Sequence, residues 1–144
     1  MSLTAAVKVP PGQTDARALR VKLRITNPAG PRIAILNPDM GVPSAAMNWP
    51  FSKEVYQTAL LLSFGYLTMS VSDEAGKELP QQVIQMSATP ALRPQLELGP
   101  GDSFEVTIPI GNFYELEPKN EYRVALEYGD RKLRVSARTR VIAP

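Results

Sequence analysis

Residues 96–128 of this chain read LELGPGDSFEVTIPIGNFYELEPKNEYRVALEY, and this stretch decides the fold class. Every even-numbered residue from 104 to 110 is apolar, and the even-numbered residues from 122 to 128 repeat that alternation. A period of two places alternate side chains on one face of a β-strand, against a core. The stretch therefore predicts a turn at residues 99–102 and two alternating strands, joined by a crossover that carries aromatic residues.

A hairpin is predicted where the second of these strands ends. Gly129 and Asp130 follow it, and residues 133–141 alternate again. Glycine in the first place of a two-residue loop is typical of a type II′ turn. Such a turn sets a register in which apolar residues meet and opposite charges meet. The expected pairs are Tyr128 with Arg131, Leu126 with Leu133, Val124 with Val135, Tyr122 with Ala137, Glu127 with Lys132 and Glu121 with Arg138.

The rest of the chain adds further strands. Apolar alternation bounded by Gly, Pro, Asn or Asp predicts strands at residues 19–26, 32–37, 67–72 and 82–87, and a short edge strand near residues 7–9. Pro109 has no N–H to donate, so the strand at residues 104–110 is predicted to lie at a sheet edge or to end there.

Residues 40–64 form an insertion with a different pattern. Ser52 is a candidate helix cap, and residues 53–62 predict a short helix with Val55, Ala59 and Leu62 on one face. A buried strand through residues 59–62 is the alternative, because four consecutive apolar residues also suit a strand.

Composition indicates one soluble globular domain over residues 1–144, partly irregular in residues 1–18. The 144 residues are 44% hydrophobic and 21% charged, and no apolar run of about 18 residues occurs, so membrane insertion is not expected. The net charge of +2 is too small to indicate nucleic-acid binding. The predicted fold is an all-β, immunoglobulin-like antiparallel β-sandwich of about seven to eight strands.

Three local patterns resemble immunoglobulin-like modules of bacterial extracytoplasmic proteins: Val21-x-Leu23-x-Ile25-Thr26-Asn27, Leu98-x-Pro100-Gly101-Asp102-Ser103, and Tyr114-x-Leu116 with Glu121-Tyr122-x-Val124 and Tyr128. The nearest family is the sandwich domain that precedes the catalytic domain of deuterolysin-like metalloendopeptidases, and a similar layout occurs in small intracellular proteinase inhibitors. The resemblance covers residues 19–36 and 67–141. It implies an accessory module, periplasmic or secreted, although the absence of cysteine also suits the cytoplasm. Tyr122 takes the position of a tyrosine corner, a structural role.

The residue types needed for common catalysis are missing. The chain has no His and no Cys, the usual general base, thiol nucleophile and zinc ligands. Glu115 and Glu117 are best explained as solvated charges, and Asp73, Asp102 and Asp130 as turn-forming residues. We therefore expect no enzyme activity and no catalytic, cofactor or metal site.

Two surfaces are candidates for a protein partner. The first is a loop with large apolar side chains amid small residues and prolines, at Met40, Met47, Trp49 and Phe51. The second, weaker candidate is a basic face that would form if residues 19–26 lay beside the last strand, with Arg20, Lys22, Arg24, Arg134 and Arg140. The structural alternatives are a Trp49 folded over the sandwich and a solvated charged face.

These observations leave two hypotheses for function. The first is a non-catalytic protein-interaction or accessory module that binds through the Trp49 loop or through an exposed edge strand such as residues 104–110, which could also form a dimer. The second is a proteinase inhibitor, in which a rigid sandwich presents residues 41–51 to a protease cleft.

Overall fold

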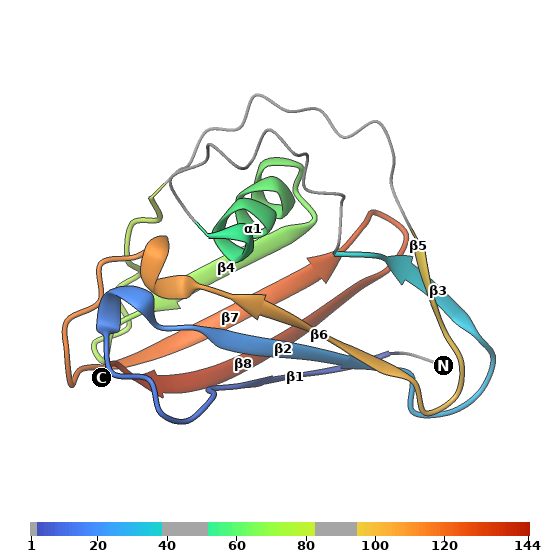
Figure 1. Cartoon of the computed structure of the whole chain (residues 1–144), viewed down its shortest axis with the longest axis horizontal. Helices are drawn as coiled ribbons and strands as arrows, with labels where there is room; N and C mark the ends of the chain where they lie inside the picture. Colours follow the sequence, from blue (N-terminus) through green and yellow to red (C-terminus); the bar gives the residue numbers. More distant parts are fainter. Residues whose placement is uncertain (1–2, 39–51, 83–94) are drawn as a thin grey trace.

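The computed structural model describes residues 3–38, 52–82 and 95–144. In these residues the protein is an all-β, sandwich-like fold, as predicted, with eight strands in three antiparallel sheets and one α-helix (Figure 1). The elements are β1 (Thr4–Lys8), η1 (Ala16–Ala18), β2 (Val21–Thr26), β3 (Ile33–Leu36), α1 (Lys53–Ser63), β4 (Leu67–Ser72), β5 (Gln95–Leu98), β6 (Ser103–Ile108), η3 (Ile110–Asn112), β7 (Glu121–Gly129) and β8 (Arg134–Ile142).

Two three-stranded sheets form the sandwich. Their strand orders are β1-β2-β6 and β4-β7-β8, which correspond to the A-B-E and C-F-G halves of an immunoglobulin sandwich. The predicted alternation is observed, because Val21, Leu23 and Ile25 of β2 are buried together with Val124 and Leu126 of β7. The third sheet pairs β3, which follows β2 in the chain, with β5, which precedes β6, and β5 is a strand that the alternation had not indicated.

Asn27 joins the small β3-β5 sheet to the β1-β2-β6 sheet. The chain leaves β2 and enters β6 at the same corner, where the Asn27 N–H donates to the carbonyl of Asp102 at 2.9 Å. Its fully buried side-chain amide donates to the carbonyls of Pro31 at 3.0 Å and Leu98 at 2.9 Å. One side chain therefore satisfies backbone carbonyls on both sides of the corner.

Residues 53–62 are helical, as predicted, rather than a strand. The Ser52 side chain accepts a hydrogen bond from the Val55 N–H at 3.3 Å, the expected cap. Of the predicted stripe, Val55 and Ala59 are buried and Leu62 is partly buried, and Tyr56, Leu60 and Leu61 are buried as well. The helix contacts β4 and β6, an outer strand of each main sheet, while β1 and β8 run side by side (Figure 1).

The predicted register of the β7–β8 hairpin is wrong by four residues. Tyr128 pairs with Val135 and Leu126 with Ala137, so the loop contains residues 130–133 rather than two residues. The Asp130 carboxylate accepts hydrogen bonds from the N–H groups of Lys132 and Leu133 at 2.9 and 3.0 Å, which stabilises the longer turn. A shift by an even number keeps every side chain on its face, so the alternation could not detect the error.

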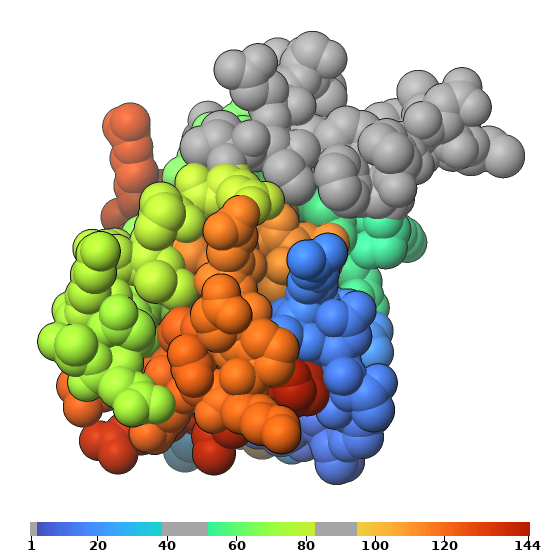
Figure 2. Space-filling view, turned by 90° about the vertical axis from the view of Figure 1, so that its left-hand side faces the viewer, coloured from blue at the N-terminus to red at the C-terminus, as the bar shows by residue number. Residues whose placement is uncertain are grey.

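Tyr122 makes the contact expected of a tyrosine corner. It is 3% exposed, and its hydroxyl accepts a hydrogen bond from the Glu117 N–H at 2.7 Å. At the same end the Gly111 N–H donates to the Leu19 carbonyl at 3.0 Å. Figure 2 shows the loop between β1 and β2, the turn after β4 and the crossover before β7 side by side on this end.

Candidate functional site

The first candidate surface cannot be placed. Met40, Met47, Trp49 and Phe51, and with them the inhibitor loop at residues 41–51, lie outside the described residues. The strand predicted at residues 82–87 also falls there, apart from its first residue. These remain predictions.

The structure divides the second candidate surface between two sheets. β2 lies between β1 and β6, whereas β8 pairs with β7, so the two basic strands are not neighbours. The basic side chains in β2 and just before it also have local partners: Arg20 forms an ion pair with Glu54 at 3.4 Å, and Lys22 one with Glu105 at 3.9 Å. The Arg24 guanidinium donates to the Ser103 hydroxyl at 3.1 Å. The continuous basic stripe that required adjacent strands is therefore absent from the described sheets.

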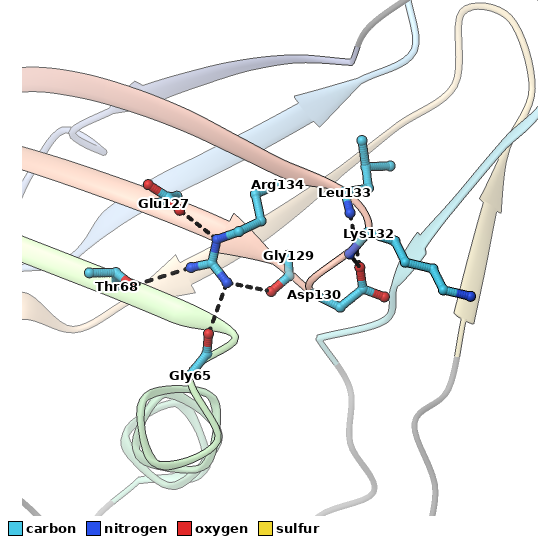
Figure 3. A network of polar contacts seen from close by, with 8 residues as sticks. All are labelled: Gly65, Thr68, Glu127, Gly129, Asp130, Lys132, Leu133 and Arg134. Atoms are coloured by element: carbon cyan, nitrogen blue, oxygen red, sulfur yellow. Dashed lines mark hydrogen bonds and ion pairs between the residues drawn. The ribbon is translucent and has the colours of Figure 1, made fainter.

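The Arg134 side chain is hydrogen-bonded within the protein at the turn end of the β7–β8 hairpin. Its Nε donates to the Glu127 carboxylate at 2.5 Å, and its Nη1 donates to the carbonyls of Gly65 at 3.0 Å and Gly129 at 3.2 Å (Figure 3). Its Nη2 reaches the Thr68 hydroxyl at 3.2 Å. The side chain thus ties the hairpin to the segment between α1 and β4, and few of its donors are left for a ligand.

Three other arginines gather at the opposite end of the same sheet. Arg123 of β7 lies directly opposite Arg140 of β8, and Arg138 lies two residues along β8, opposite Ala125. All three arginines are exposed, on the face that alternates with the buried Tyr122, Val124 and Val141. With Ser70 and Ser72 of β4 they line an open groove of about 570 Å³.

Glu121, opposite Ile142 on the same sheet face, and Glu78, which accepts a hydrogen bond from Ser70, border this cluster without forming an ion pair with its arginines. The ion pairs among the described residues use other basic side chains, so Arg123, Arg138 and Arg140 form none. Like charges directly opposite each other on neighbouring strands are destabilising, and an anion between them would remove that cost. The arrangement can hold a carboxylate or another oxyanion, since guanidinium groups bind such groups by two parallel hydrogen bonds.

The sequence did not predict this cluster, because the predicted register of the β7–β8 hairpin was wrong. In the predicted register Arg138 faces Glu121, and the basic face is half neutralised. The observed register puts Arg138 opposite Ala125 and brings Arg123 opposite Arg140. Arg123 was not among the predicted site residues, and only the length of the turn could have indicated it.

The inner face of this sheet is held by tyrosines. The Tyr114 hydroxyl donates to the Met69 carbonyl at 3.2 Å, and the Tyr128 hydroxyl donates to the Leu36 carbonyl. Burial, with a smaller effect of Glu78, raises the pKa of Tyr114 to about 12. Burial, with a smaller effect of Asp130, raises the pKa of Tyr128 further. Both hydroxyls are hydrogen-bond donors at neutral pH, and they connect the inner side of the sandwich to backbone carbonyls of β4 and β3.

The fold and the groove together define a β-sandwich with an arginine-lined outer sheet face. A comparison with protein-family models finds no match, and a search of curated proteins finds none either. Among the residues that the structure describes, no group of three or more potential metal-ligating side chains occurs. None of the described helices is long and apolar enough to cross a membrane.

Proposed function

We propose that this protein is a non-catalytic interaction module that binds an acidic segment of a partner protein on the outer face of β7 and β8. The observation that carries the proposal is the unneutralised arrangement of Arg123, Arg138 and Arg140 on a regular sheet. A sequence without His or Cys supports a binding role rather than catalysis.

Simple energetics set the expected strength of such binding. An exposed ion pair contributes roughly 0–1 kcal/mol, so three arginine contacts supply about 0–3 kcal/mol. Bidentate contacts to a carboxylate lie at the upper end, because Arg presents its donors in a fixed plane. The proposed complex is therefore weak by electrostatics alone and loses affinity as salt is added.

The proposal is tested by peptide selection with a matched counter-selection. A random 12-residue library displayed on phage is selected on the wild-type protein, on Arg123→Ser/Arg138→Ser/Arg140→Ser, and on Arg20→Ser/Lys22→Ser/Arg24→Ser. The last variant loses the same charge from the other sheet. Circular dichroism and thermal unfolding first establish that all three proteins are folded.

We expect acidic sequences to be enriched on the wild type and on the β2 variant but not on the three-arginine variant. Acidic peptides that bind all three proteins equally would contradict the proposal, as would the absence of any acidic enrichment. An inhibitor that acts through residues 41–51 would instead keep its binding in both variants. The accessory setting, periplasmic or secreted, is supported by the resemblance to bacterial extracytoplasmic modules, whose tyrosine corner Tyr122 reproduces.

A further inference from the structure

We infer that the groove recognises an extended peptide segment with two carboxylates at alternate positions and an apolar side chain at the next alternate position. This inference rests on the proposed function and names its ligand. The ligand lies along β8 so that its carboxylates meet Arg138 and Arg140 and its apolar side chain meets Ile142.

The spacing along β8 supplies the first argument. Arg138, Arg140 and Ile142 follow each other at intervals of two residues and all three are exposed. A strand rises about 3.3 Å per residue, so neighbouring members of this row are roughly 6.6 Å apart. An extended peptide has the same repeat, and carboxylates two residues apart therefore match the two arginines. Carboxylates on adjacent residues point to opposite sides of the peptide and do not.

The pairing across the sheet supplies the second argument. Arg140 has Arg123 directly opposite, so a carboxylate at this position lies between two guanidinium groups. Arg138 has Ala125 opposite, so a carboxylate there contacts one guanidinium and finds room beside it. The two acidic positions are consequently unequal, and the position at Arg140 contributes more to affinity.

The rim of the groove keeps the ligand over β7 and β8. On the β4 side the Ser70 hydroxyl donates to the Glu78 carboxylate at 3.2 Å, which places a negative charge along that edge. Acidic side chains are repelled from this rim and attracted to the arginines. The charge distribution thus selects the β8 row rather than a path across the three strands.

Ile142 supplies the apolar end of the pattern. It is 68% exposed, far more than Val9, which is the other exposed large hydrophobic residue in the described part of the chain. Exposure alone would not indicate a binding role, since single apolar residues are normal on protein surfaces. Its place in the same row as Arg138 and Arg140 gives the exposed side chain a specific use.

Two fluorescein-labelled peptides of identical composition test the inference. The first contains Glu-Ser-Glu-Ser-Ile and the second Glu-Glu-Ser-Ser-Ile, each flanked by Gly-Ser, and fluorescence anisotropy is measured at low ionic strength with the full chain. We expect the alternating peptide to bind up to about fivefold more tightly, the factor that one additional exposed ion pair can supply. Arg140→Ser should weaken its binding more than Arg138→Ser does, and Ile142→Ser should also weaken its binding.

The outcomes separate the inference from the proposed function. Equal binding of the two peptides, lost in Arg123→Ser/Arg138→Ser/Arg140→Ser but kept in Arg20→Ser/Lys22→Ser/Arg24→Ser, overturns the peptide pattern and leaves acidic binding intact. Binding of neither peptide, or binding that all variants share, overturns the proposed function as well. Unchanged affinity in Ile142→Ser for both peptides overturns the apolar position.

Discussion

The two ends of the β7–β8 ladder carry the same residue type on the same face and use it in opposite ways. At the turn end Arg134 is bound to Glu127, Thr68 and two backbone carbonyls. At the far end Arg123 and Arg140 face each other without an ion pair. The difference shows that an arginine is structural where its donors are satisfied within the chain, and available for binding where they are not.

Turn geometry creates this contrast. The four-residue loop at residues 130–133 places Arg134 beside Glu127. The same register, followed along the two strands, places Arg123 opposite Arg140. In the two-residue turn that the sequence favours, the glutamates at positions 121 and 127 would have neutralised other basic residues. The same four-residue shift therefore forms the structural network at one end and exposes the charged cluster at the other.

The largest expected effect follows from a substitution in the turn itself. Gly129 has φ +138°, and a Cβ there would lie 2.0 Å from the Leu133 carbonyl oxygen. We expect Gly129→Ala to lower the free energy of unfolding by about 3 kcal/mol, because strain and overlap with backbone add. Urea unfolding measures this, with Gly76→Ala as the control, since Gly76 has φ +83° and no neighbour within 4 Å. An equal loss in both variants would show that the turn is not tightly built.

The second effect is a loss of stability at alkaline pH. Folding raises the pKa of Tyr114 to about 12 and that of Tyr128 further, from an ordinary value near 10. The two buried hydroxyls contribute fully to the free energy of unfolding below pH 10. Above pH 10 this contribution declines, because the tyrosines of the unfolded chain lose their protons at a lower pH than those of the folded chain. The expected slope is about 1.4 kcal/mol per pH unit for each tyrosine.

Urea unfolding at pH values from 9 to 11 tests this expectation. Tyr128→Phe should reduce the slope of unfolding free energy against pH, because it removes the titrating hydroxyl at the turn end of β7. Tyr114→Phe should reduce the same slope, because it removes the titrating hydroxyl that bonds to β4. A slope that neither substitution changes would mean that other groups titrate.

The third prediction compares the two kinds of arginine directly. Arg134→Ala should lower the free energy of unfolding by about 1–2 kcal/mol, because it removes charged hydrogen bonds from a partly exposed site. Arg138→Ala should change it by less than about 0.5 kcal/mol, as for most surface substitutions. Chemical denaturation of both variants at one ionic strength measures the two changes in the free energy of unfolding. If Arg138→Ala costs as much as Arg134→Ala, the contrast between the two ends is lost.

The smallest effect should have the opposite sign. Arg123→Thr removes the like-charge opposition to Arg140 and should raise the free energy of unfolding by about 0.3 kcal/mol. The gain should be visible in thermal unfolding at low salt and should fade as salt screens the wild-type repulsion. A variant less stable than the wild type at low salt would indicate that Arg123 has a stabilising partner.

Particular residues show how far sequence reasoning reached. The alternation from Tyr122 to Tyr128, the Ser52 cap and the tyrosine corner at Tyr122 were predicted and are observed. These are local features, since a period, a cap and a turn depend on residues close together in the chain. The adjacency of β2 and β8, on which the candidate basic face depended, is absent, and the sequence could not decide it because strand order depends on contacts between distant segments.

The sequence by itself determined the fold class and the face on which each β7 and β8 side chain lies, and it favoured a helix over a strand at residues 53–62. Alternation carries this information, because a strand turns every second residue to the same side. Only the tertiary structure decided which arginine meets which partner, since pairing depends on the turn length and on backbone carbonyls such as those of Gly65 and Gly129. Arg134 became a structural residue and Arg123, Arg138 and Arg140 an open cluster for that reason.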